Sequence, residues 1–177
     1  LYIGAYAESI PECDVCLIDC QAEELDFDEL SKRILEIKPD VVGVQVMTFT
    51  LIDSVHTSEL VKKVCPEAFV VFGGPHPTLY PHETVRLPSV DAVVYGEGEY
   101  PFKKMLGRMV SKDKIESIRG IITKKDIPLN KELDFIENLD ELKTPAYHLL
   151  NLPLYSSPLA SSERIMTMMS SRGCPGK

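Results

Sequence analysis

The sequence lacks any long hydrophobic run. No stretch reaches the roughly 18 consecutive apolar residues that a membrane-spanning helix needs. Residues 1–10 also lack the basic start and the small-residue cleavage site of a secretory signal. We therefore expect no membrane span and a cytoplasmic location.

Basic residues are scarce. The chain has 19 Lys and Arg against 27 Asp and Glu, a formal net charge of -8. A protein that binds a phosphate backbone usually presents a basic patch or stripe. Nucleic acid is therefore not expected as a direct partner.

The five cysteines do not indicate a disulfide framework. Their number is odd, and 177 residues are enough to build a hydrophobic core without covalent cross-links. Reduced thiols or metal ligands fit the pattern better.

Apolar runs that end in turn residues alternate with amphipathic stretches, the pattern of parallel strands joined by crossover helices. It predicts a Rossmann-like (flavodoxin-like) α/β fold, a parallel sheet with helices on both faces. The expected strands are 14–19, 41–47, 68–72 and 91–95, and the expected helices are 1–8, 27–37, 52–64, 82–87 and 100–110.

Individual signals sharpen this prediction. Asp26 and Glu29 form a capping box, and Pro39 ends the helix that follows it. The run 41–47 is nearly continuously apolar, as in a strand buried on both faces. No strand is predicted before the first helix, which leaves an unpaired seam in the sheet, so we expect either a homodimer formed there or a first strand supplied by residues upstream of Leu1.

The chain divides into an α/β domain (1–132), an inter-domain linker (133–163) and the start of a second domain (164–177). Prolines and serines break any periodicity in the linker. A small hairpin is expected around 118–131, a proline-rich loop at 75–81 and a new strand at 164–170.

Two glycine clusters follow neighbouring strands. Gly73-Gly74 and Gly96-Glu97-Gly98-Glu99 lie at the carboxyl edge of the predicted sheet, where open α/β sheets bind ligands. Gly74 would let the backbone approach a ligand closely. The alternatives are a tight turn for the first pair and acidic capping of the following helix for the second cluster.

Four segments together carry a family resemblance: GGPHPTLYP (73–81), VDAVVYGEGE (90–99), LDELKTPA (139–146) and SSRGCPGK (170–177). Their order resembles the cobalamin (vitamin B12)-binding domain of radical S-adenosylmethionine proteins, of the magnesium-protoporphyrin IX monomethyl ester oxidative cyclase or class B methyltransferase type. The resemblance covers the whole chain.

The resemblance implies cobalamin, a four-iron four-sulfur cluster and S-adenosylmethionine as cofactors of the full-length protein. Cys174 would be the first ligand of a C-x3-C-x2-C motif, with the second ligand expected at position 178, beyond Lys177. Thiolates suit iron-sulfur clusters. No catalytic residue is expected within this chain.

The residues expected to bind cobalamin lie in the loops after the strands. They are Gln45, Met47, Thr48, Gly73, Gly74, Pro75, His76, Gly96, Glu97 and Gly98. His76 could instead only fix a proline-rich turn, and Phe49 could be core. The D-x-H-x-x-G motif that supplies an axial imidazole in related folds is absent, and His56 is interpreted as an ordinary helical residue.

Cys13, Cys16 and Cys20 have the spacing C-x2-C-x3-C, the reverse of the radical motif. A strand would spread these thiols over about 20 Å, too far for one cluster. We interpret them, like Cys65, as small core residues.

We therefore expect the cobalamin-binding domain of an enzyme that transfers a methyl group to an unactivated carbon of a small molecule, or closes a ring there by oxidation. The chain alone would not be catalytic. The alternative is a non-catalytic corrinoid-binding or docking module that has lost cobalamin.

Overall fold

The fold is built on one four-stranded sheet. The structure, a computed structural model, describes residues 1–126, 135–155 and 166–173. The strands, in spatial as well as chain order, are β1 (Val41–Gln45), β2 (Phe69–Gly73), β3 (Ala92–Val94) and β4 (Ile121–Thr123). β1, β2 and β3 are parallel, and β4 is antiparallel to β3. The predicted α/β class is confirmed, with one antiparallel edge.

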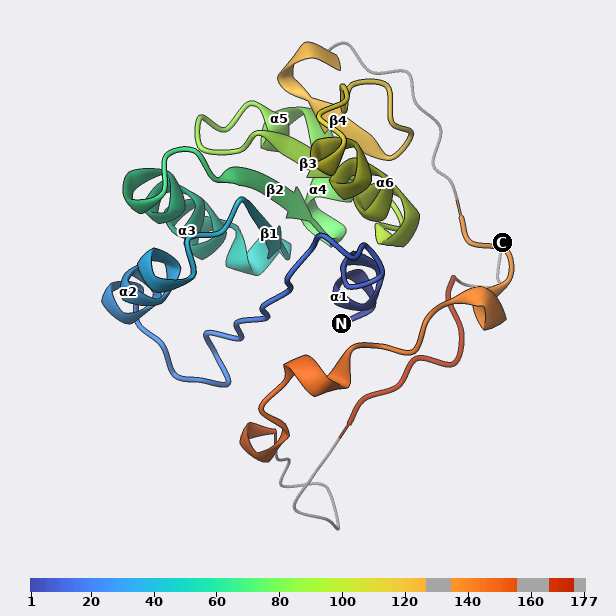
Figure 1. The fold of residues 1–177 in the computed structure, drawn as a ribbon, viewed down its shortest axis with the longest axis horizontal. Coiled ribbons are helices and arrows are strands. Elements are labelled where there is room, and N and C mark those ends of the chain that lie inside the picture. Colours follow the sequence, from blue (N-terminus) through green and yellow to red (C-terminus); the bar gives the residue numbers. More distant parts are fainter. Residues whose placement is uncertain (127–134, 156–165, 174–177) are drawn as a thin grey trace.

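Helices connect the strands and cover the sheet (Figure 1). They are α1 (Tyr2–Ala7), α2 (Phe27–Ile37), α3 (Leu51–Val64), α4 (Pro75–Leu79), α5 (Pro81–Val85) and α6 (Glu99–Val110). Short 3₁₀ turns occur at η1 (Thr48–Thr50), η2 (Lys124–Asp126), η3 (Leu139–Glu141), η4 (Tyr147–Leu149) and η5 (Leu152–Leu154). In the described parts of the chain, no helix is long and apolar enough to cross a membrane.

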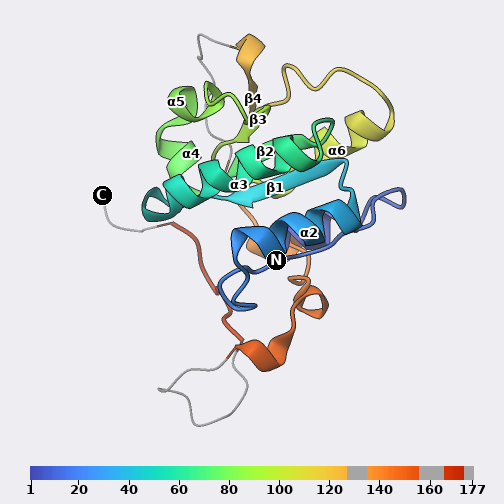
Figure 2. The ribbon, with the colours of Figure 1, turned by 90° about the vertical axis from the view of Figure 1, so that its left-hand side faces the viewer.

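The sheet has a hydrophobic core on each face. Because side chains alternate along a strand, Val70 and Phe72 of β2 point to one core and Val71 points to the other. The first core receives α2, α3 and α5, and the second receives α1 and α6. Figures 1 and 2 show α2 and α3 on the opposite side of the sheet from α6. Helices on both faces are thus confirmed.

The start of α2 follows the sequence signal. The Glu29 backbone N–H donates to Asp26 Oδ1 at 2.8 Å, and the Asp26 N–H donates to Glu29 Oε2 at 3.1 Å. This capping box satisfies amides that have no helical partner. The helix ends at Ile37, and Lys38 adopts a left-handed conformation before Pro39.

The predicted strand 14–19 is wrong. These residues form no strand, although Val15 packs against one core and Ile18 against the other. Apolar residues are therefore found in this segment because they pack against the two cores, although the segment does not pair with a strand. β1 is an edge strand of the sheet: Val42 and Val44 pack on one core and Val41 packs on the other, but the strand is only partly buried, so the expectation of full burial is wrong.

Three further predictions differ from the structure. Segment 75–81, expected as a loop, contains α4, which begins with Pro75 at a position where the missing N–H costs nothing. The first arm of the hairpin is β4, but it pairs with β3, and its second arm (128–131) lies outside the described residues. Residues 166–170, expected in a strand, have no regular secondary structure.

The segment after β4 packs on the domain through polar contacts. Tyr155 Oη donates to Asp19 Oδ2 at 2.7 Å, and His148 Nε2 lies 2.7 Å from Glu8 Oε1. Tyr147 Oη in turn donates to the carbonyl of Thr167 at 2.8 Å. Residues 135–155 therefore hold both the α/β layer and the last described segment. The linker bounds 133–163 stay a prediction.

Candidate functional site

The carboxyl ends of the three parallel strands meet at one edge of the sheet, so the loops that follow them are neighbours. We call residues 45–52, 73–80 and 95–98 the rim. Its first two loops are joined through the backbone: the Val46 N–H donates to the Gly73 carbonyl at 2.8 Å, and the His76 N–H donates to the Val46 carbonyl at 3.1 Å. The rim is therefore one connected surface.

His76 links two of the rim loops through its side chain. Its Nδ1 lies 3.2 Å from Thr48 Oγ1, and its ring packs on Tyr80 with centroids 5.1 Å apart. The residue is 8% exposed. The structure therefore gives His76 a positioning role in the rim, which is the alternative that the sequence left open, while a role toward a ligand stays a prediction.

Gly74 is required by the protein itself. Its φ is +103°, a conformation that side chains rarely adopt, and an added Cβ would lie 3.1 Å from the Val46 carbonyl oxygen. The missing side chain would thus point at the β1 backbone. The backbone conformation and the nearby Val46 carbonyl therefore explain a glycine at position 74 without any ligand.

Thr78 joins the two glycine clusters, and sequence reasoning missed it. Its Oγ1 donates to the Gly74 carbonyl at 2.9 Å and accepts from the Gly96 N–H at 3.0 Å. Gly96 has a φ of +77°. The available signal was the position of this threonine between the two glycine clusters, on the same edge of the sheet.

The outer surface of the rim is apolar. Phe49 is 83% exposed, so the option that it belongs to the core is wrong. Three more large apolar side chains of the rim are exposed: Ile52, Leu79 and Tyr80. Single exposed apolar residues are normal, but these four lie in or next to η1, α3 and α4, which follow neighbouring parallel strands, and such a group forms a patch typical of a ligand or partner surface.

The other expected binding residues surround this patch. Gln45, Thr48 and Pro75 are exposed, whereas Met47, Gly73, Gly74, Gly96, Glu97 and Gly98 are half-buried. Cys174 lies outside the described residues.

The N-cap of α6 is Gly98, so no side chain at the N-cap accepts a hydrogen bond from the first-turn N–H groups, and Glu99 is the acidic residue of that first turn. Glu97 Oε2 accepts from the Ile136 N–H at 2.5 Å, and Glu99 Oε1 accepts from Arg172 Nη2 at 2.5 Å. Both carboxylates are therefore already engaged within the protein. The capping alternative is therefore wrong for a side-chain cap, whereas Glu99 does lie in the first turn, where an acid complements the helix dipole.

The clustered cysteines do not converge. Cys13 packs against the core under α6, Cys20 packs against the core under α3, and Cys16 is exposed. The interpretation of all three as buried core residues is thus wrong for Cys16. Within residues 1–126, 135–155 and 166–173, no group of three His, Cys, Asp or Glu side chains could hold a metal ion.

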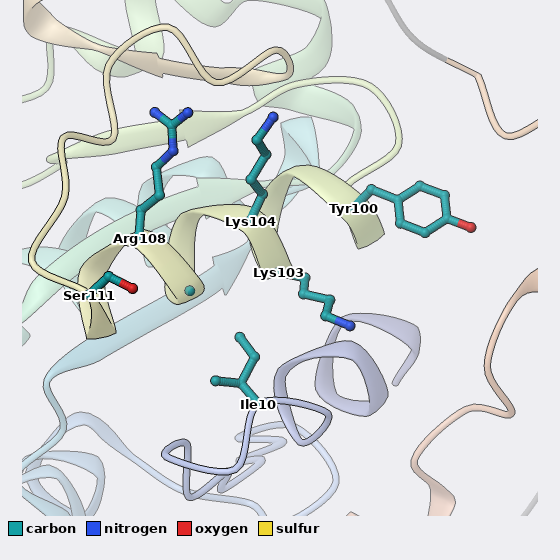
Figure 3. Close-up of a pocket in the computed structure, with 7 residues that line it drawn as sticks. Ile10, Tyr100, Lys103, Lys104, Arg108 and Ser111 are labelled. Carbon is teal, nitrogen blue, oxygen red and sulfur yellow. The ribbon is translucent and has the colours of Figure 1, made fainter.

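A separate hollow of about 590 Å³ runs along α6 (Figure 3). Ile10 closes it from the segment after α1, and Gly107 leaves open space in its floor. Lys103 points toward Ile10, whereas Lys104 and Arg108 point to the other side of the helix. It lies along the flank of the domain, and the rim residues described above do not line it.

Comparison with known proteins gives the family. The model of the B12 binding domain family matches residues 1–106. An uncharacterized methyltransferase of Pyrococcus horikoshii is 36% identical over 93% of this chain and 36% of that protein. The anaerobic magnesium-protoporphyrin IX monomethyl ester cyclase of Rubrivivax gelatinosus is 28% identical over 98% of this chain and 32% of that protein. The chain therefore spans about a third of the length of these relatives.

The fold agrees with a solved structure. The radical S-adenosylmethionine methyltransferase TsrM of Kitasatospora setae superposes with a TM-score of 0.58 over 69% of this chain and 25% of that chain, at 18% identity. This likeness concerns the fold. Together with the family match over more than half of the residues, it confirms the resemblance seen in the sequence: the chain belongs to the B12-binding domain family.

Proposed function

We propose that this chain binds cobalamin across the rim, with the corrin ring covering the exposed side chains of Phe49, Ile52, Leu79 and Tyr80. The observation that carries the proposal is this apolar patch at the carboxyl ends of three parallel strands. Ligands of open α/β sheets bind at that edge. Membership of the B12-binding domain family supports the choice of ligand.

Apolar and polar residues of the rim would contribute different contacts to the ligand. The apolar side chains would cover the ligand and exclude water. Thr48 and Gln45, both exposed, would offer polar contacts to the amide-bearing edge of a corrin, and His76 would hold Thr48 in place. Bound cobalamin supplies a cobalt centre that can carry a methyl group.

We further propose that the whole protein is a radical S-adenosylmethionine enzyme that transfers a methyl group or closes a ring by oxidation on a small molecule. Two sources support this: the motif order that ends in SSRGCPGK, and the names of the relatives above. Cys174 would be the first ligand of its four-iron four-sulfur cluster. Free thiols at Cys13, Cys16, Cys20 and Cys65 suit the reducing cytoplasm, where we place it. Cysteines at positions 178 and 181 in a longer reading frame are the expected result, and their absence would rule out the radical chemistry.

The binding proposal is tested by anaerobic titration of the chain with hydroxocobalamin, followed by the visible bands of the corrin. Phe49→Ser should weaken binding about tenfold, because the loss of one large apolar contact is worth roughly 1.5 kcal/mol. Ile37→Ser is the matched control, since Ile37 is exposed at the end of α2, before β1 begins. Equal affinities of the two variants would move the site away from the rim.

The second candidate function is a docking module that binds no corrinoid. The observation that favours it is that Gly74, Glu97 and Thr78 all have partners inside the protein, so the rim is complete without a ligand. Absence of any binding by the folded wild-type chain would support this alternative.

The exposed edge of β1 supports a proposal about partners, a homodimer formed by strand pairing. Since Val46 bonds to β2, the alternate residues Val41, Gly43 and Gln45 direct their N–H and C=O groups to the open edge. Unpaired edges of this kind favour association. Light scattering across a dilution series should show a dimer, and Gly43→Pro, which removes an outward N–H, should abolish it. A monomer at every concentration would overturn this proposal.

A further inference from the structure

Arg172 reaches from the last described segment into the loop after β3. Its Nη2 lies 2.5 Å from Glu99 Oε1, and its Nη1 lies 3.3 Å from Glu97 Oε1. The three side chains are largely buried: 17% of Arg172, 17% of Glu97 and 6% of Glu99 is exposed. One guanidinium therefore pairs with two carboxylates at a site with little water.

The loop itself explains why a cation is needed there. Gly98 is pressed against α1, because an added Cβ would lie only 2.9 Å from Ile3 Cδ1. Water is thereby displaced from the side of the loop that faces α1. A carboxylate as buried as that of Glu99 is costly unless it is paired and hydrogen-bonded. The planar guanidinium presents N–H groups in fixed directions on separate nitrogens, so Nη1 contacts Glu97 while Nη2 contacts Glu99, whereas an ammonium has all its donors on one nitrogen.

Two further contacts draw other segments into the same cluster. The Arg172 guanidinium lies over the ring of Tyr2 in α1, 5.2 Å from its centroid. The second oxygen of Glu97 accepts from the Ile136 backbone N–H. The start of α1, residues 97–99, Ile136 and Arg172 therefore meet in one cluster, although Arg172 and Glu99 are 73 positions apart in the sequence.

We propose that Arg172 is a positioning residue: its guanidinium, held by Glu97, Glu99 and the ring of Tyr2, fastens segment 166–173 to the loop after β3. This loop is part of the rim, and Arg172 stands two positions before Cys174 in the sequence. The fastening therefore sets the point from which the cysteine motif continues. The role in placing the cysteine motif rests on the proposed function, whereas the contact of Arg172 with the two carboxylates requires no cofactor.

Initial tryptic cleavage after Arg172 tests the fastening. Trypsin must take the arginine side chain into its own pocket, so a guanidinium held by two carboxylates is protected, and the rate follows the fraction of open chains. The isosteric change Glu99→Gln keeps the cleavage site and should raise the rate about tenfold, as loss of a partly buried charge pair implies. Arg172→Lys, also a trypsin site, should be cleaved faster than wild type because its single nitrogen cannot occupy the positions of both Nη1 and Nη2.

Glu59→Gln is the control, because Glu59 is an exposed carboxylate of α3 and its replacement changes the net charge equally. It should be cleaved at the wild-type rate, and urea unfolding should show that all variants are folded. Equal cleavage of Glu99→Gln and Glu59→Gln would overturn the proposal. A hydroxocobalamin titration of the same samples separates the two proposals. If Glu99→Gln is cleaved faster but wild type binds no cobalamin, the proposal about Arg172 stands and the proposed cobalamin function is rejected.

Discussion

Thr48 Oγ1 and His76 Nδ1 lie 3.2 Å apart, and this contact joins the loop after β1 to the helix after β2. The histidine is buried, so a lost partner is not fully replaced by water. The contact therefore bears on both the stability and the shape of the rim.

Thr48→Val should destabilise the chain by about 1 kcal/mol, the usual cost of leaving a buried polar group without its partner. The measurement is urea unfolding. Thr57→Val is the control, since Thr57 Oγ1 bonds only to the Asp53 carbonyl on an exposed part of α3. An equal or larger effect at Thr57 would show that the Thr48 contact contributes nothing special.

Gly74→Ala should destabilise the chain by roughly 1–3 kcal/mol, because the position combines a positive φ with a Cβ directed at the backbone of Val46. Gly107→Ala in α6 is the opposite case: its Cβ meets nothing within 4 Å, and alanine favours helix by up to ~1 kcal/mol. Thermal unfolding of both variants checks the pair. A neutral Gly74→Ala would contradict the described backbone.

Tyr155 should make the stability of the chain fall between about pH 10 and pH 12. Burial, and then the hydrogen bond to the Asp19 carboxylate, raise the pKa of Tyr155 to about 12. The folded state thus keeps the phenol proton where an unfolded tyrosine, with a pKa near 10, has lost it. The stabilisation is complete below pH 10 and is lost as the pH rises through the folded pKa.

The measurement is urea unfolding of wild type and Tyr155→Phe at pH 8 and pH 10.5. Wild type should lose more stability between these two values than the variant, which has no phenol at this position. Parallel profiles would mean that segment 135–155 is not held at Asp19.

The sequence predicted those elements whose signals are local. β1, β2 and β3 follow from short apolar runs that end in polar or glycine residues, and α2 follows from the Asp26 capping box. It failed where the outcome depends on distant partners. Segment 14–19 has the composition of a strand, but a strand exists only if a neighbour pairs with it. α4 was missed because its two prolines resemble a loop, although Pro75 is well tolerated at a helix start.

For the site, the sequence predicted the location of the rim but not the side-chain contacts within it. Glycine clusters at strand ends located the rim, and the motif order gave the family. The exposure of Phe49 could not be predicted, because an aromatic residue after an apolar strand is equally compatible with the core. The contact of Arg172 with Glu97 and Glu99 spans more than seventy residues, and no periodicity or spacing encodes such a pair.

The most direct test of the account is a map of amide chemical shifts from the ¹⁵N-labelled chain during titration with hydroxocobalamin. We expect saturable one-to-one binding, with shifts concentrated at residues 45–52, 73–80 and 95–98. Residues along the hollow of α6, such as Lys103, Gly107 and Ser111, should stay unchanged and serve as an internal control. Shifts confined to that hollow, or no saturable shifts in a folded chain, would contradict the claim that the rim binds cobalamin.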